Sequence, residues 1–206
     1  YTEPKDLVLD QMVGSGTTLI ECKLLGRNAI GVDINRDAIM VARNRLNFPY
    51  TPLDEDYTSE IRTFVGDARN LNLIDNETID LIATHPPYAG IISYSEVEGD
   101  LSKLKIEKYV EEMKKVAEES YRVLKPDHCC AILVGDTRKH KHYIPISAII
   151  LRKFLEVGFV LKEDIIKQQW KMKTTREKWR GNHDFYLIAH EHLYIFRKTE
   201  KRGIGT

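Results

Sequence analysis

A histidine, two prolines and a tyrosine stand in a row at His85-Pro86-Pro87-Tyr88, directly after an apolar run. Two prolines end a strand ladder and hold the backbone rigid, so the Pro86 carbonyl points in a fixed direction. Fixed acceptors of this kind orient the N–H bonds of an attacking amine and stabilise the positive charge that develops on its nitrogen. Tyr88 adds a flat face for a base. The turn predicts chemistry on an amino group, and a rigid turn without chemistry is the alternative.

A glycine turn near the start of the chain predicts a ligand-binding loop. Leu7 to Leu9 are apolar enough for an inner strand, and Gly14 and Gly16 let the backbone turn tightly and approach a ligand. Thr17 or Thr18 is expected to cap the helix that follows, whose free N–H groups favour anionic ligand groups. The dinucleotide pattern G-x-G-x-x-G fails because its third glycine is missing, and no Gly-Lys-Ser/Thr of a phosphate loop follows.

Strand-like and helix-like segments alternate along the chain. Strands are expected at 7–10, 29–34, 61–65, 79–83, 128–135, 159–168 and 185–197, and helices at 17–26, 37–46, 105–124 and 146–155. This order predicts an α/β fold with a mostly parallel sheet and helices on both faces. The last two strands are joined by a loop without a helix, so the last of the seven strands should be antiparallel.

Acidic residues stand at the ends of three of the predicted strands, at Asp10, Asp33 and Asp67. In doubly wound sheets, ligands bind beyond the carboxyl ends of the strands, so these acids should line one edge. A carboxylate accepts two hydrogen bonds, which suits Asp33 to the two ribose hydroxyls of a nucleoside. Asp67 could accept from an adenine amine, and Asp10 could orient an ammonium group, directly or through water. A helix cap or a plain loop residue is the alternative for each acid.

The glycine turn resembles the S-adenosylmethionine loop of amino-methyltransferases, usually written D-P-F-x-G-S-G-T-T. His85-Pro86-Pro87-Tyr88 is similar to their D/N/S-P-P-Y signature, and residues 186–198 are similar to the H-E-Y-l-l-v-F-k-K ending of the DNA adenine-N6 and cytosine-N4 methylases. The resemblance covers nearly the whole chain and implies a Rossmann-like methyltransferase fold. It also implies cofactor-binding residues at Asp10, Met12, Gly14, Ser15, Gly16, Thr17, Thr18, Asp33, Ile34, Asp67 and Ala68, and catalytic residues at His85, Pro86, Pro87 and Tyr88.

The resemblance implies methyl transfer from S-adenosylmethionine to an exocyclic amine of adenine or cytosine in DNA, by direct in-line displacement, as in restriction-modification systems. Three positions depart from the family pattern. Gln11 and Met12 replace Pro and Phe, and His85 replaces Asp, Asn or Ser. A neutral imidazole still accepts one hydrogen bond but a protonated one does not, so activity should fall at low pH. An RNA methyltransferase, for instance one acting on guanine N2 of transfer RNA, and an inactive cofactor-binding module are the alternatives.

A basic segment near the C-terminus is the expected nucleic-acid contact. It contains an aromatic side chain, Trp179, among the basic residues Lys171, Lys173, Arg176, Lys178 and Arg180. Cations grip phosphates and an indole stacks on a base, although a solvated hairpin loop fits the same composition. We expect the partner to be DNA rather than RNA. The loop 89–104 directly follows the Pro-Pro turn and could close over the substrate.

The composition of the chain limits the kinds of partner, metal site and location to be expected. The chain of 206 residues carries 31 basic and 31 acidic side chains, so any basic face must be local. Three cysteines and a His140/His142 pair make neither a disulfide framework nor a metal site, and a reducing cytoplasm is the expected location. Without a long apolar run, no membrane helix is expected. We expect one domain over residues 1–206 that lacks an upstream segment, and the sequence assigns no oligomeric state.

Overall fold

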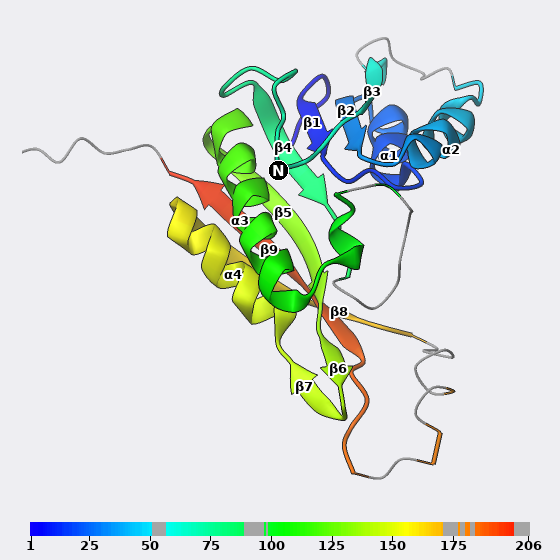
Figure 1. Cartoon of the computed structure of the whole chain (residues 1–206). Helices are drawn as coiled ribbons and strands as arrows, with labels where there is room; N and C mark the ends of the chain where they lie inside the picture. The colour runs from blue at the N-terminus through cyan, green and yellow to red at the C-terminus, as the bar shows by residue number, and fades with distance from the viewer. Residues whose placement is uncertain are drawn as a thin grey trace, which may run out of the picture.

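A computed structural model describes residues 1–50, 57–88, 97, 99–170, 177, 180–181 and 184–199. In this part of the chain, seven strands form one sheet in the order β3-β2-β1-β4-β5-β9-β8 (Figure 1). Every neighbouring pair is parallel except those of β9, which runs antiparallel to both β5 and β8. The strands are β1 Leu7–Asp10, β2 Asn28–Asp33, β3 Ile61–Val65, β4 Ile79–Thr84, β5 Leu124–Gly135, β8 Phe159–Gln168 and β9 His190–Lys198. The predicted α/β fold with one antiparallel strand is confirmed.

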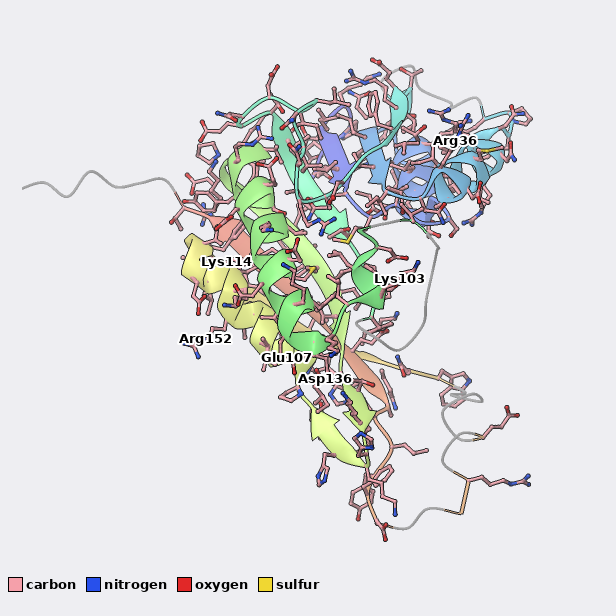
Figure 2. All side chains as sticks on the ribbon, in the orientation of Figure 1. Arg36, Lys103, Glu107, Lys114, Asp136 and Arg152 are labelled. Atoms are coloured by element: carbon pink, nitrogen blue, oxygen red, sulfur yellow. The ribbon has the colours of Figure 1, made fainter. Side chains whose placement is uncertain are left out.

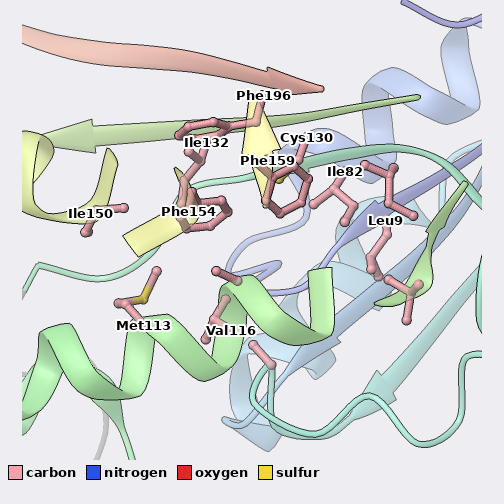
Figure 3. Close-up of a cluster of buried hydrophobic side chains, with 14 of the residues drawn as sticks. Leu9, Ile82, Met113, Val116, Cys130, Ile132, Ile150, Phe154, Phe159 and Phe196 are labelled. Atoms are coloured by element: carbon pink, nitrogen blue, oxygen red, sulfur yellow. The ribbon is translucent and has the colours of Figure 1, made fainter. Parts of the chain in front are cut away.

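Helices pack on both faces of this sheet because apolar side chains of the inner strands alternate between the faces. On one face, Val8 packs with residues of α1, Thr17–Leu24, and α2, Arg36–Leu46. On the other face, Leu9 belongs to a larger cluster with α3, Ile106–Val123, and α4, Ile146–Val157 (Figure 1). Figure 3 shows side chains of this larger cluster meeting between the sheet and the two helices. No described helix has the length and apolar character needed to cross a bilayer.

Four local features differ from the sequence expectation. Strand β9 begins at His190 instead of residue 185. Strand β5 begins at Leu124, directly after the end of α3 at Val123 and four residues before the expected start at 128. A short hairpin of β6, Thr137–Lys139, and β7, His142–Ile144, follows β5 where no strand was expected, and a 3₁₀ turn, η2, spans Leu101–Lys103.

Candidate active site

A cavity of about 670 Å³ opens at the carboxyl ends of the first four strands. This volume lies within the range of ordinary small-molecule sites. Its lining includes most of the residues predicted to hold a cofactor, together with three of the Pro-Pro turn: Asp10, Met12, Gly14, Ser15, Thr17, Thr18, Asp33, Ile34, Asp67, Ala68, His85, Pro86 and Pro87. The topology explains this arrangement, since parallel strands deliver their C-terminal residues to one edge.

The glycine turn joins β1 to α1 with both glycines in left-handed conformations. Gly14 has φ +49° and Gly16 has φ +82°. Gly16 is not among the residues that line the cavity; a Cβ there would lie 2.9 Å from the Cβ of Ala42, so it serves the close packing of α1 on α2. Gly16 is also the N-cap of α1 and no side chain caps the helix, so the expected cap by Thr17 or Thr18 is wrong.

Asp33 ends β2 and holds the glycine turn in place. Its Oδ2 accepts a hydrogen bond from the Gly14 amide at 2.9 Å, and its Oδ1 accepts one from the Asn35 amide at 2.9 Å. Burial raises the pKa of Asp33 above its ordinary value. A carboxylate offers about four acceptor positions, so two remain for hydroxyl groups in the cavity.

Asp10 ends β1 and is almost fully buried. It accepts hydrogen bonds from the Thr84 hydroxyl at 2.9 Å and the Met12 amide at 3.2 Å. Burial is the largest influence on this carboxyl and raises its pKa to about 6. The neighbouring departure from the family pattern, Gln11, is buried and bonds to the Ser120 hydroxyl at 2.8 Å. Gln11 therefore fastens the glycine turn to α3.

Asp67 follows β3 and is already engaged with an arginine. The guanidinium of Arg69 contacts both carboxylate oxygens, with its Nη2 2.5 Å from Oδ2 and its Nε 2.9 Å from Oδ1. Arg69 also donates to Glu112 of α3 at 2.7 Å and to the Gly99 carbonyl at 3.0 Å. Arg69 thus ties the cavity wall to α3, and neither Arg69 nor Glu112 was expected from the sequence.

The Pro-Pro turn leads directly out of β4. The hydroxyl of Tyr88 lies 3.3 Å from the Nε2 atom of His85, and the two rings meet edge to face. Gly135 at the end of β5 leaves space for Tyr88, because a Cβ there would lie 2.8 Å from Cε1 of the tyrosine ring. His85, Pro86 and Pro87 line the cavity, whereas Tyr88 lies beside it.

A buried glutamate of β9 supports this turn. Glu191 pairs with Gly135 of β5 and with Lys167 of β8 in the two antiparallel ladders, so the three residues form one row across the sheet. The Tyr88 hydroxyl donates to Glu191 Oε1, and Lys167 Nζ lies 2.8 Å from Oε2. Despite its burial, Glu191 keeps a pKa below its usual value, with the Lys167 hydrogen bond as the main lowering influence.

His85 completes this network. Its Nε2 lies 3.7 Å from Glu191 Oε1. Burial has the largest effect on the imidazole and lowers its pKa below the usual value, although the Glu191 charge acts in the opposite direction. His85 therefore favours the neutral form, which has a lone pair for accepting a hydrogen bond. Sequence reasoning included Glu191 only as part of the C-terminal resemblance and gave it no role.

Most of the predicted nucleic-acid segment lies outside the described residues, including Lys171, Lys173, Arg176 and Lys178. Arg180 is described and exposed. Trp170, directly before the segment, is 82% exposed, and Tyr186, six positions after Arg180, is 94% exposed. Two unburied aromatic rings on either side of a basic segment are compatible with base stacking. The expected loop over the substrate is also largely outside the described residues, at 89–96 and 98.

Comparison with known proteins shows the family to which this chain belongs. Residues 1–44 and 79–204 match a family model described as DNA methylase, that of the N6 and N4 methyltransferases. The chain belongs to the DNA methylase family. The family and the fold of this methylase support S-adenosylmethionine as its cofactor, as the two sequence motifs predict.

Curated relatives of this methylase include type II methyltransferases and tRNA methyltransferases. It is 28% identical over 180 residues to the type II methyltransferase M.MjaI of Methanocaldococcus jannaschii, and 25% identical over 176 residues to the type II beta methyltransferase M.BslI of a Bacillus strain. These alignments cover 71% and 73% of the chain but 58% and 19% of the two relatives. A tRNA (guanine(10)-N2)-dimethyltransferase of Pyrococcus abyssi is 30% identical over 131 residues, 63% of the chain and 36% of that relative.

Solved structures share the fold at low sequence identity. A SAM-dependent methyltransferase from Methanosarcina mazei superposes with a TM-score of 0.66 at 15% identity, covering 97% of this chain and 96% of that one. TrmN from Thermus thermophilus gives a TM-score of 0.60 at 17% identity, covering 96% of this chain and 45% of that one. These similarities confirm the Rossmann-like methyltransferase fold.

The residues at the cavity fit S-adenosylmethionine chemically. Asp33 offers carboxylate acceptors for ribose hydroxyls, and the buried Asp10 offers one for an ammonium group. Ile34, Val41 and Leu101 give the cavity apolar wall suited to a purine. Val41 and Leu101 were not predicted, because α2 and η2 reach the cavity only through the tertiary fold.

Proposed function

We propose that this methylase transfers the methyl group of S-adenosylmethionine to the exocyclic amine of adenine or cytosine in DNA. The observation that carries the proposal is the position of His85-Pro86-Pro87 in the wall of the cavity that also contains Asp33 and the glycine turn. One cavity then serves the methyl donor and the acceptor amine. In this proposal residues 1–206 act as one cofactor-binding domain.

When bound, S-adenosylmethionine supplies a methyl group on a positively charged sulfur. The chain has two acceptors for the amine that takes this methyl, the Pro86 carbonyl and the neutral His85 imidazole. Hydrogen bonds to these acceptors would turn the nitrogen lone pair out of the base ring and stabilise the developing charge. The proton of the methylated amine then leaves to solvent. Tyr88, fixed by Glu191, offers its ring to the target base.

DNA is the proposed polymer because the family model that matches this chain is described as DNA methylase, and two of the relatives are named type II methyltransferases. Transfer RNA is the second candidate, supported by the similarity to the Pyrococcus abyssi enzyme. The basic segment containing Arg180, together with the exposed rings of Trp170 and Tyr186, is the proposed polymer contact.

The chain is incubated with methyl-labelled S-adenosylmethionine and one polymer at a time: duplex DNA, transfer RNA or protein extract. The experiment tests which polymer receives the methyl group. Label in DNA alone is the expected result. Label in transfer RNA alone would replace the proposal by the second candidate. Cofactor binding by equilibrium dialysis without transfer to any polymer would indicate a binding module, and His85→Asp would then be expected to raise activity.

A further inference from the structure

Three potential metal ligands meet beside β9, away from the cofactor cavity. Asp136 directly follows β5, and His190 and His192 are the first and third residues of β9. One ligand atom from each lies within 4.8 Å of the ligand atoms of the other two, and all three residues are half-buried. We call these residues the histidine–aspartate cluster. Figure 2 labels Asp136 where the β6–β7 hairpin leaves the body of the fold.

The sheet register creates this cluster. Gly135 pairs with Glu191, so Asp136 and His190 both lie at the same end of the β5–β9 ladder. Residues two apart on a strand face the same side, which places His190 and His192 on one face and Glu191 on the other. The two imidazole rings are 5.3 Å apart between centroids, and the His192 ring stacks on Tyr194, a core residue.

Hydrogen bonds behind the cluster orient two of its ligands. His192 Nδ1 lies 3.0 Å from Asp164 Oδ1 on β8. Because a neutral imidazole that donates through Nδ1 carries its lone pair on Nε2, this contact presents Nε2 as a ligand. The Asp136 carboxylate accepts from the Ser147 amide at 2.8 Å and from the Tyr143 hydroxyl, and each of its oxygens keeps a further lone pair. Carboxylates behind ligating histidines are a regular feature of metal sites.

A purely structural role for the cluster does not explain the position of the His190 side chain. Within the described residues, its ring nitrogens have no hydrogen-bond partner, although the ring faces His192 beside a carboxylate. Two imidazoles and one carboxylate match the donor set of zinc sites that keep a fourth position for water. Zinc bond lengths of 2.0–2.2 Å require ligand atoms about 3.4 Å apart, so modest side-chain rotation would close the cluster on an ion.

We propose that the histidine–aspartate cluster binds one divalent transition-metal ion, with Zn²⁺ the best match to its ligands. The ion would join the start of β9 to the turn after β5. Glu191 lies between the two ligating histidines and contacts Tyr88, so this ion would stiffen the support of the Pro-Pro turn without taking part in the chemistry. The site is independent of the methyl-transfer proposal, and metal binding tests it separately.

Isothermal titration calorimetry of the whole, tag-free chain with Zn²⁺ tests the proposal. We expect one Zn²⁺ per chain, and Co²⁺ at the same site should give the intense visible absorption of a four-coordinate ion. His190→Gln and Asp136→Asn should remove stoichiometric binding. Asp164→Asn, which weakens the support behind His192, should lower the affinity roughly 10–100-fold. Binding should also raise the thermal midpoint of the wild-type chain but not that of His190→Gln.

His142→Gln is the matched control, because His142 is an exposed histidine of the nearby β7 outside the cluster. It should bind zinc like the wild type. The proposal is overturned if the wild-type chain does not bind zinc stoichiometrically, or if His190→Gln binds as tightly as His142→Gln. His190 has no hydrogen bond to lose among the described residues, so His190→Gln should fold, and circular dichroism checks this.

Discussion

The hydroxyl of Tyr88 donates a hydrogen bond to Glu191, a residue 103 positions further along the chain. This bond connects the turn after β4 to β9, and β9 lies two strands away in the sheet. Lys167 holds the other carboxylate oxygen of Glu191, and Gly135 leaves the space in which the tyrosine ring lies. The orientation of the proposed base-stacking ring is therefore set by the C-terminal hairpin of the sheet.

Glu191→Gln tests this support. Removing the charge weakens the bonds to Tyr88 and Lys167, so we expect kcat to fall roughly tenfold while the dissociation constant of S-adenosylmethionine stays unchanged. Tyr88→Phe should cost a similar factor, and the double variant should lose less than the product of the two. Glu163→Gln on the exposed part of β8 is the control. An equal loss of cofactor affinity in Glu191→Gln would show that Glu191 acts on the fold rather than on the turn.

Asp33→Ala tests the ribose assignment. Loss of charge-assisted hydrogen bonds, each worth about 1.5–3 kcal/mol, should weaken S-adenosylmethionine binding by roughly 10–100-fold or more. Isothermal titration of the variant measures this directly. Asp127→Ala serves as the control, because Asp127 pairs with Arg197 outside the cavity. Unchanged affinity in Asp33→Ala would refute the assignment.

Asp10→Asn should make the cofactor-free chain more stable at pH 8. Burial raises the pKa of Asp10 from 3.8 to about 6, so the folded state prefers the protonated carboxyl. The stability that this preference contributes is complete below pH 4 and is lost as the pH rises through 6. Asparagine avoids the buried charge, and we expect a gain of up to about 3 kcal/mol at pH 8 that shrinks toward pH 5.

Urea unfolding of wild type and Asp10→Asn at the two pH values measures this difference. S-adenosylmethionine should bind the variant more weakly, because the proposed ammonium contact needs the ionised acid. An equal free-energy difference at pH 5 and pH 8 would show that the charge of Asp10 is not the cause.

His85 should limit activity only at acidic pH. Since burial lowers its pKa below 6.5, the imidazole is neutral at pH 7 and can accept a hydrogen bond from the amine. At saturating S-adenosylmethionine, we expect kcat to fall below pH 6.5 with the same pKa that an NMR titration of the His85 ring reports. His85→Asn, which keeps an acceptor, should lose this dependence, and His85→Ala should lower kcat roughly 100-fold. A His85→Asn profile identical to that of the wild type would exclude His85 as the titrating group.

The sequence predicted the alternation of strands and helices along the chain, because the strands are apolar runs separated by helical periodicity and turn residues. It could not predict the β6–β7 hairpin. The turn of this hairpin places His140 at φ +49° and Lys141 at φ +67°, conformations that sequence patterns associate with Asn and Gly. The cap of α1 was missed for a related reason, since Gly16 occupies the N-cap in a left-handed conformation and leaves the threonines inside the helix.

Residues of the cavity wall were predictable where they end or directly follow a strand, as Asp10, Asp33 and His85 do. Partners brought in by tertiary contacts were not. Arg69 reaches Glu112 of α3, and Glu191 reaches Tyr88 across two strands. Alternation along β9 places Glu191 on a single face, but only the sheet order shows that this face meets the Pro-Pro turn.

The atom that receives the methyl group is the most direct test of the proposed function. Duplex DNA treated with the chain and S-adenosylmethionine should be digested to nucleosides and analysed by mass spectrometry. We predict N6-methyladenine or N4-methylcytosine, and much less of that product with Asp33→Ala at low cofactor concentration or with His85→Ala. Methyl groups found on carbon 5 of cytosine, or only on guanine N2 of transfer RNA in a parallel digest, would contradict the account.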